Sequence, residues 1–255
     1  MPILETWKTR TRVSRSTTSA LVHFGIAIII VTVSVTLIME ELELPKHALF
    51  QALGIFGALS GILFFGKRKP ILTRSFGAAN RITLVRAYMT SILASLIGSA
   101  TQLTEKEIWI LVLFAAVVLV LDGLDGWVAR YFHTGSTFGA AFDLEVDALF
   151  ILILAVITWE LNKVGSWVLL IGVMRYLFVV AGWVIPALQQ PLPSNQRRRV
   201  ICLIQAGVLL FALCPVISPA TASLFAMLAL TLLVISFSQD IYYLVCNTSS
   251  PGDTP

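Results

Sequence analysis

Long apolar stretches, each followed by a short polar break, repeat along almost the whole chain. Each stretch approaches the roughly 20 residues that an α-helix needs to cross the hydrocarbon core of a bilayer. The breaks carry prolines or charges, as at Pro45 with its acidic neighbours, at Pro70 in a basic stretch, and at Pro215 with Pro219. The pattern predicts eight transmembrane helices, over residues 19–39, 47–66, 82–100, 107–132, 137–158, 164–186, 198–217 and 220–246.

Composition supports this interpretation. Of the 255 residues, 57% are hydrophobic and only 13% are charged, and the mean hydropathy is +0.88. A soluble domain of this size needs more charge to cover its surface. The first apolar stretch is too long for a secretory signal and no small-residue cleavage site follows it, so we expect a retained helix. The predicted fold class is an all-α integral membrane protein without a soluble domain.

Lysine and arginine are distributed unequally between alternate loops. If the N-terminus is cytoplasmic, three of them lie outside, namely Lys46, Lys106 and Lys163, and Arg175 lies within a predicted helix. The other fourteen lie inside: Lys8, Arg10, Arg12, Arg15, Lys67, Arg68, Lys69, Arg74, Arg81, Arg86, Arg130, Arg197, Arg198 and Arg199. The positive-inside rule therefore predicts that both termini are cytoplasmic. The net charge of +4 then reflects topology and attraction to anionic headgroups, and it does not indicate nucleic-acid binding.

Carboxylates interrupt two neighbouring apolar stretches. Asp122 and Asp125 lie in the fourth predicted helix, and Asp143 and Asp147 lie in the fifth. At 100° per residue, each pair falls within one narrow sector of its helix. Charged groups at membrane depth are costly, so they usually face the interior of a bundle and mark a functional site. The two acidic faces confront each other, which requires either protonation or intervening cations, and oxygen ligands select Mg²⁺ or Mn²⁺.

Small residues and one arginine accompany these carboxylates. Gly126, Ala129 and Gly139 remove side-chain bulk, so that a substrate can lie close to the backbone. Arg130 closes the fourth helix at the predicted cytoplasmic edge, where a guanidinium can bind a phosphate. These residue types suit a pyrophosphate group bridged by metal.

The complete arrangement resembles the signature of the CDP-alcohol phosphatidyltransferase family. All eight fixed positions are present with the usual spacing: Asp122-x2-Asp125-Gly126-x2-Ala129-Arg130-x8-Gly139-x3-Asp143-x3-Asp147. The resemblance implies attack by an acceptor hydroxyl on the β-phosphorus of a CDP-linked lipid, with release of CMP. CDP-diacylglycerol is the expected donor. CDP-choline or CDP-ethanolamine with a diacylglycerol acceptor uses the same motif and is the alternative.

The resemblance also implies roles for individual residues. The four aspartates would hold two Mg²⁺ or Mn²⁺ ions, and Asp147 would in addition act as the general base. The residues expected to bind the cytidine diphosphate are Asn80, Thr83, Asp122, Gly126, Ala129, Arg130 and Gly139. Asn80 and Thr83 belong to Asn80-x2-Thr83-x2-Arg86, which is similar to the opening of the first core helix in many members. Ala79 stands where these members commonly have a proline.

The family core of six helices maps onto residues 80–246. Residues 1–79, with two helices, are then an accessory N-terminal segment, and residues 247–255 form a cytoplasmic tail. The expected location is the cytoplasmic (inner) membrane, with the active site facing the cytoplasm. The expected partners are the CDP-linked donor, the alcohol acceptor and the bilayer. A homodimer is left open.

The acceptor is predicted from basic residues. Arg175 lies near the middle of the sixth predicted helix and needs an anionic partner, either the aspartate cluster or the acceptor. Related enzymes that use phosphorylated polyols hold the acceptor phosphate with basic residues in this region. The resemblance therefore favours a phosphorylated alcohol bound by Arg175, Arg198 and Arg199. Ala148 departs from several such members, in which Lys or Arg follows the last aspartate.

Two functions of other classes share part of the pattern. A membrane prenyltransferase also uses an acidic motif like Asp143-x3-Asp147, but its two acidic motifs lie far apart in sequence. A cation-coupled transporter also binds ions with intramembrane aspartates, but its inverted repeats are not apparent in this chain.

Overall fold

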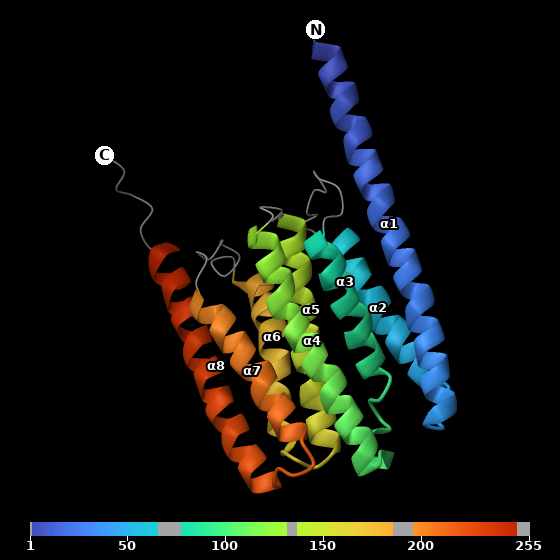
Figure 1. Cartoon of the computed structure of the whole chain (residues 1–255). Helices are drawn as coiled ribbons and strands as arrows, with labels where there is room; N and C mark the ends of the chain where they lie inside the picture. Colours follow the sequence, from blue (N-terminus) through green and yellow to red (C-terminus); the bar gives the residue numbers. More distant parts are fainter. Residues whose placement is uncertain (1, 66–77, 132–136, 186–195, 249–255) are drawn as a thin grey trace. The chain divides into compact units, whose positions relative to one another are not determined.

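The chain is all helical throughout the part that its computed structural model describes, residues 2–65, 78–131, 137–185 and 196–248 (Figure 1). The α-helices are α1 (Pro2–Glu41), α2 (His47–Phe65), α3 (Ala78–Ala94), α4 (Glu105–Tyr131), α5 (Thr137–Glu160), α6 (Leu169–Val184), α7 (Gln196–Leu213) and α8 (Pro219–Thr248). Two short 3₁₀ turns, η1 (Ala100–Gln102) and η2 (Ser166–Val168), precede α4 and α6. The predicted all-α fold class is confirmed, and each of the eight predicted helices corresponds to one of these.

Helix boundaries follow from local hydrogen bonding. At the start of α4, the backbone N–H of Thr104 donates to the Glu107 carboxylate at 2.6 Å, and the Thr104 hydroxyl faces the Glu107 N–H at 3.4 Å, which forms a capping box. Helix α8 begins with Pro219, and the Ser218 hydroxyl accepts a bond from the N–H of Thr221 at 3.2 Å. Helix α3 ends at Ala94, before the predicted residue 100, and the chain then turns through Gly98 at a φ of +85°.

Four helical segments are long and apolar enough to cross a membrane: Ala20–Glu41, Glu105–Leu124, Ser166–Val184 and Pro219–Leu244. A shorter apolar segment covers His47–Ile62. These segments present large apolar side chains on their outer surfaces, for example Leu21, Ile29 and Val120, as expected for surfaces that contact lipid. Helices α3, α5 and α7 carry charged residues in their first halves, for example Arg81, Asp143 and Arg198. The chain is an integral membrane protein.

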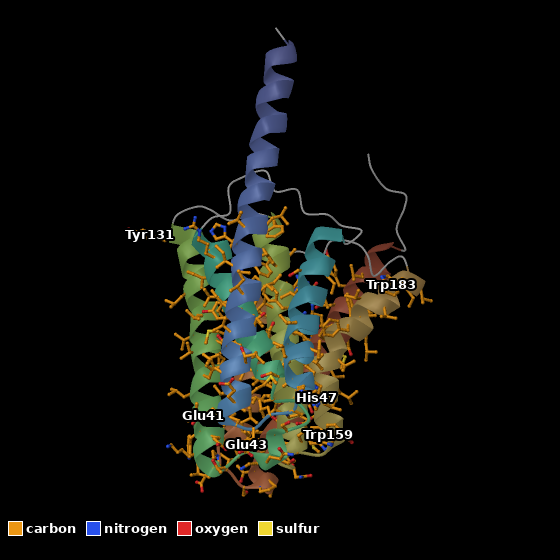
Figure 2. The ribbon with its side chains drawn as sticks, turned by 90° about the vertical axis from the view of Figure 1, so that its right-hand side faces the viewer. Glu41, Glu43, His47, Tyr131, Trp159 and Trp183 are labelled. Atoms are coloured by element: carbon orange, nitrogen blue, oxygen red, sulfur yellow. The ribbon has the colours of Figure 1, made fainter. Side chains whose placement is uncertain are left out.

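The chain divides within α5 into two compact units, Met1–Leu149 and Phe150–Pro255. In the first unit, α3 packs against α1, α2 and α4, and it is buried along most of its length. The apolar core of this unit combines α1, α2, α3 and the start of α5: Ala20, Phe24, Ala27, Val31, Val35, Ala52, Phe56, Leu59, Leu84, Ala87, Ile92, Phe138, Phe142 and Val146. In the same unit Glu41, Glu43 and His47 lie at one end and Tyr131 at the other (Figure 2).

The second unit is built on contacts of α8 with α7 and α6. The buried Gln205 side chain of α7 donates to the carbonyl of Ala229 in α8 at 2.8 Å. The ammonium of Lys163 donates to the carbonyls of Cys214, Pro215 and Ile217, at 2.8 to 3.2 Å. These carbonyls follow the end of α7, where a helix leaves acceptors without intrahelical partners and favours a cation. Lys163, which the sequence indicates only as a loop residue, thus ties α7 to the turn after α5.

Phe24 connects the N-terminal helices to α5, which leads to a prediction about stability. Its ring centroid lies 5.6 Å from that of Phe142 and 5.9 Å from that of Phe56. Phe24→Ala leaves a cavity in this core, and we expect the thermal midpoint in detergent to fall by at least about 5 °C. Phe50→Ala in α2 is the matched control, because Phe50 is 74% exposed. Equal midpoints for the two variants would show that α1 does not stabilise the unit.

Candidate metal centre

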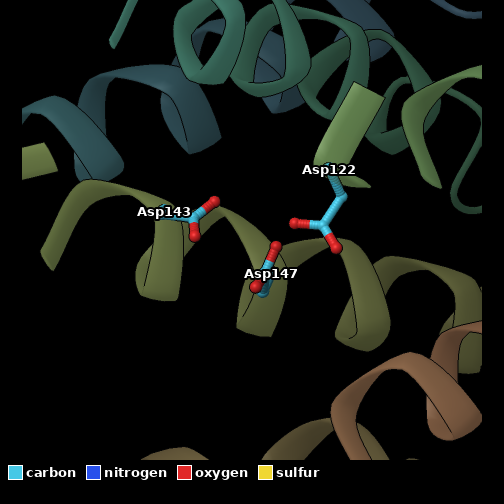
Figure 3. A group of neighbouring side chains, drawn as sticks. All are labelled: Asp122, Asp143 and Asp147. Carbon is cyan, nitrogen blue, oxygen red and sulfur yellow. The ribbon is translucent and has the colours of Figure 1, made fainter. Parts of the chain in front are cut away.

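Three aspartates from two helices converge in the first unit. Asp122 lies in α4, and Asp143 and Asp147 lie one turn apart in α5 (Figure 3). One carboxylate oxygen from each lies within 4.8 Å of those of the other two. The side chains remain between 19% and 32% exposed, so the cluster is partly open to solvent or ligand. The structure therefore brings together three of the four predicted metal ligands.

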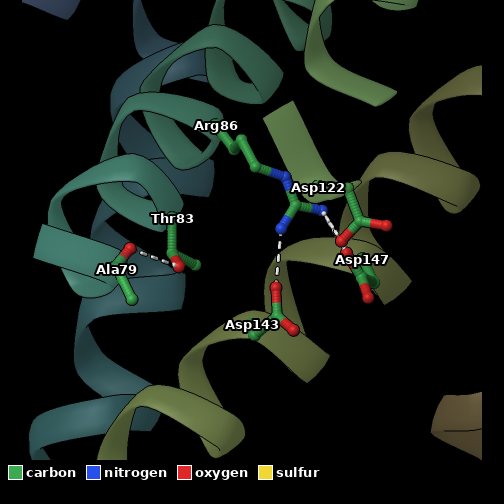
Figure 4. Close-up of polar contacts among 6 residues, drawn as sticks. All are labelled: Ala79, Thr83, Arg86, Asp122, Asp143 and Asp147. Atoms are coloured by element: carbon green, nitrogen blue, oxygen red, sulfur yellow. Dashed lines mark hydrogen bonds and ion pairs between the residues drawn. The ribbon is translucent and has the colours of Figure 1, made fainter. Parts of the chain in front are cut away.

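Arg86 of α3 projects its guanidinium into this cluster (Figure 4). Its Nη2 lies 2.9 Å from Asp122 Oδ1 and also contacts Asp147 Oδ1. Its Nη1 donates to Asp143 Oδ1 at 2.6 Å. The Arg86 side chain is only 1% exposed, so Arg86, which the count of lysines and arginines groups with the cytoplasmic loop residues, lies in the interior of the first unit. The side of the membrane on which it lies stays a prediction. Arg86 is buried because α1, α2 and α4 surround α3, which a positive-inside count cannot detect.

A sequence signal for Arg86 was present. Asn80, Thr83 and Arg86 follow one another at intervals of three residues, which places them on one side of a helix. Arg86 also falls inside an expected apolar span, where an ionisable residue marks a functional site by default. Asn80 and Thr83 are themselves buried, and the Thr83 hydroxyl donates to the Ala79 carbonyl at 3.1 Å. The predicted role of these two residues in nucleotide binding is not tested by these contacts.

The donor set fits a hard divalent cation. All three groups offer carboxylate oxygens, which Mg²⁺ and Mn²⁺ prefer. Among the described residues, three carboxylates against one guanidinium leave an excess of negative charge, which a cation would offset. Glu145 is not part of the group among the described residues, in agreement with its rotation of about 200° from Asp143 around the helix.

For the remaining predicted site residues of α4 and α5, the structure gives the helix to which each belongs but not every side chain. Gly126 lies in α4 and Gly139 in α5, beside the grouped aspartates in sequence. Asp125, Ala129 and Arg130 belong to α4, but their side chains lie outside the described residues. Their predicted roles stay predictions.

The predicted acceptor-binding arginines belong to the second unit. Arg175 lies in α6, and Arg198 and Arg199 lie at the start of α7. Their neighbour Arg197 contacts the Asp240 carboxylate of α8 at 2.7 Å, and Asp240 had no predicted role. This ion pair joins the first turn of α7 to α8. The part that Arg175, Arg198 and Arg199 take in binding an acceptor stays a prediction.

Comparison with known proteins adds one finding to this geometry. The model of the CDP-alcohol phosphatidyltransferase family matches residues 76–237, which is more than half of the chain. The chain belongs to the CDP-alcohol phosphatidyltransferase family. No curated protein and no solved structure matches it.

Membership decides between the classes of function that the sequence left open. A CDP-alcohol phosphatidyltransferase is an enzyme of phospholipid biosynthesis that transfers a phosphatidyl group from a CDP-linked substrate to an alcohol acceptor. The prenyltransferase and transporter alternatives are therefore set aside. Members use divalent metals, and the Asp122, Asp143 and Asp147 group could hold such an ion. In this phosphatidyltransferase the matched region begins near the start of α3 and includes all three aspartates.

Proposed function

We propose that the chain transfers the phosphatidyl group of CDP-diacylglycerol to an alcohol and releases CMP, with two Mg²⁺ or Mn²⁺ ions at the aspartate cluster. The observation that carries this proposal is the convergence of Asp122, Asp143 and Asp147 in a chain of this family. The helices can keep the acyl chains of the donor in the hydrocarbon while its headgroup reaches the partly exposed carboxylates.

The proposed site residues have two kinds of role, which are binding of metal and substrate and transfer of a proton. Asp122, Asp125, Asp143 and Asp147 act as metal ligands. When bound, the ions neutralise the diphosphate oxygens and the charge that develops on the departing CMP. The cytidine diphosphate is bound by Asn80, Thr83, Asp122, Gly126, Ala129, Arg130 and Gly139. The small residues among these let the nucleotide approach the backbone, and Arg130 binds phosphate.

Asp147 receives the proton in the transfer step. The acceptor hydroxyl oxygen forms a bond to the β-phosphorus, the bond from that phosphorus to the CMP oxygen breaks, and the hydroxyl proton passes to the Asp147 carboxylate. Asp147 suits this role because it lies one turn along α5 from Asp143 and is the least exposed of the three grouped aspartates, at 19%. A carboxylate must lie within hydrogen-bonding reach of the hydroxyl to act in this way.

The location that we propose is the cytoplasmic membrane, with both termini and the aspartate cluster on the cytoplasmic side. The unequal distribution of lysine and arginine supports this orientation even without Arg86, which is buried. Acidic Glu41 and Glu43 lie at the opposite end of the first unit from Tyr131, the last residue of the Asp122 helix (Figure 2).

Cysteine accessibility tests this orientation. In a variant without native cysteines, we expect Cys at Thr101 to react with a membrane-impermeant thiol reagent added to intact cells. Thr101 is exposed and lies between α3 and α4. Cys at Ser194, which lies outside the described residues, and Cys at Thr248 should react only after the membrane is opened. Reaction of Ser194→Cys in intact cells would place the active site on the other face.

The acceptor that we propose is a phosphorylated alcohol, held by Arg175, Arg198 and Arg199. A guanidinium binds a phosphate through two parallel hydrogen bonds. We expect Arg175→Gln to raise the KM for the acceptor at least about tenfold, with little change in the KM for CDP-diacylglycerol. The measurement is initial CMP release at varied concentrations of each substrate. An unchanged acceptor KM, or efficient use of an uncharged alcohol, would exclude this acceptor class.

The reaction itself is tested by CMP release. Purified protein in detergent, with Mg²⁺ or Mn²⁺ and CDP-diacylglycerol, is incubated with a panel of phosphorylated and uncharged alcohols. CMP formation that depends on donor, acceptor and metal supports the proposal. Turnover with CDP-choline or CDP-ethanolamine and diacylglycerol, but none with CDP-diacylglycerol, would establish the alternative donor. No CMP from any of these donors would refute both.

A further inference from the structure

Arg86 makes an unusual set of contacts for a charged side chain in a membrane protein. It is almost completely buried, and its two terminal nitrogens contact one oxygen from each of the three grouped aspartates (Figure 4). The aspartates lie 36 to 61 residues further along the chain and come from two other helices. A single guanidinium therefore joins α3, α4 and α5 at the carboxylate cluster.

Without a cation, these carboxylates would repel one another. Their oxygens lie within 4.8 Å, and like charges at that separation interact strongly where the dielectric constant is low. Arg86 supplies the positive charge that the described residues place among them. A planar guanidinium suits this purpose because its fork of donors can reach several carboxylates at once.

The same contacts put Arg86 in competition with a metal ion. Its Nη2 lies between Oδ1 of Asp122 and Oδ1 of Asp147. An ion shared by these carboxylates would have to lie at about 2.1 Å from its ligand oxygens. A nitrogen and an ion cannot both occupy the space between these two oxygens. The positive charge of the guanidinium also opposes the approach of a second cation.

We propose that Arg86 is an exchangeable counter-ion, which holds Asp122, Asp143 and Asp147 together when no metal is bound and withdraws from them when a divalent ion binds. This inference rests on the proposed function, because it requires that the aspartates are metal ligands. Side chains on a helix point toward its N-terminus. The withdrawn guanidinium therefore stays on the side of Asn80 and Thr83, where the phosphates of the donor are proposed to bind.

Metal binding to purified protein without donor lipid tests the exchange. Free Mn²⁺ is measured by electron paramagnetic resonance during titration of the normal protein, Arg86→Gln and Arg81→Gln. We expect Arg86→Gln to bind Mn²⁺ at least about tenfold more tightly, because the competing charge is gone. Arg81→Gln removes the same charge from an exposed position of the same helix and should change affinity less than about twofold.

Thermal unfolding in detergent gives a second measurement. In the presence of a chelator, Arg86→Gln should unfold at a lower temperature than Arg81→Gln, because its carboxylates lack a counter-ion. Added Mn²⁺ should then raise the midpoint of Arg86→Gln more than that of the normal protein. If Arg86→Gln does not fold, Arg86→Lys replaces it. Lysine keeps the charge but cannot bridge three carboxylates, so this variant should also bind Mn²⁺ more tightly.

Two other results of the Mn²⁺ titration would overturn the exchange. Weaker Mn²⁺ binding by the Arg86 variants would show that the guanidinium organises the ligands and stays with them. Unchanged binding would show that it does not compete. Either result overturns the exchange but leaves the proposed function intact, provided that the normal protein binds Mn²⁺ and releases CMP. If the normal protein does neither, the proposed function and the exchange both fail.

Discussion

Replacing Asp122 or Asp143 with Asn is expected to abolish CMP release, with a loss of more than about 10²-fold. Asparagine keeps the size of the side chain but removes the charge that a metal ligand supplies, and the developing charge on the phosphates then loses its partner. The same result is expected for Asp125→Asn from its position in the motif. The measurement is the initial rate of CMP release at saturating Mn²⁺, on protein that remains monodisperse in detergent.

Glu145→Gln is the matched control for these variants. It removes a carboxylate from the same helix as Asp143, but Glu145 is not in the metal-ligand group that the described residues form. We expect it to keep activity within about threefold of normal, which is the range of a substitution away from the reacting groups. If Asp122→Asn or Asp143→Asn kept more than about a tenth of normal activity, the ligand assignment would be wrong.

Asp147→Asn should separate transfer from binding. Without a base for the acceptor hydroxyl, we expect turnover to fall by about 10²-fold to 10⁴-fold. Binding of CDP-diacylglycerol in the presence of Mn²⁺ should change much less, because Asp122, Asp125 and Asp143 would still hold the metal under the proposed assignment. The two quantities are measured on the same preparation, by CMP release and by equilibrium binding of labelled donor.

Asp143→Asn provides the comparison for this second experiment, since it should lose donor binding together with turnover. The two substitutions change the same kind of residue one turn apart in α5. If Asp147→Asn lost binding in proportion to activity, Asp147 would be chiefly a metal ligand. The proton of the acceptor would then have to pass to another group.

The helices, and the helix faces on which the aspartates lie, were predictable from sequence because both depend on local properties. The length of an apolar stretch and the polar break after it determine where a membrane helix begins and ends. The predicted segment 137–158 therefore lies close to α5 at Thr137–Glu160, and 220–246 lies close to α8 at Pro219–Thr248. The 100° turn per residue likewise determines that Asp143 and Asp147 share a face.

The burial of Arg86 and the identity of its ion-pair partners were not predictable in this way. Arg86 stands near the start of a predicted helix, where a lysine or arginine usually lies at the membrane surface. Whether it does so depends on the helices that surround α3, and α1 and α2 come from the segment before the family match begins. Phe24 of α1 packs on Phe142, the residue before Asp143, so this segment also supports the acidic helix.

The sequence by itself determined the helical membrane fold, the four acidic positions and the family. Only the tertiary structure decided that Asp122, Asp143 and Asp147 meet around Arg86. The physical reason is that periodicity acts within one helix, whereas the balance of charge in a buried cluster depends on contacts between residues 36 to 61 positions apart. A count of charges along the chain assigns Arg86 only to a side of the membrane, and the packing of α1, α2 and α4 around α3 buries it among the carboxylates.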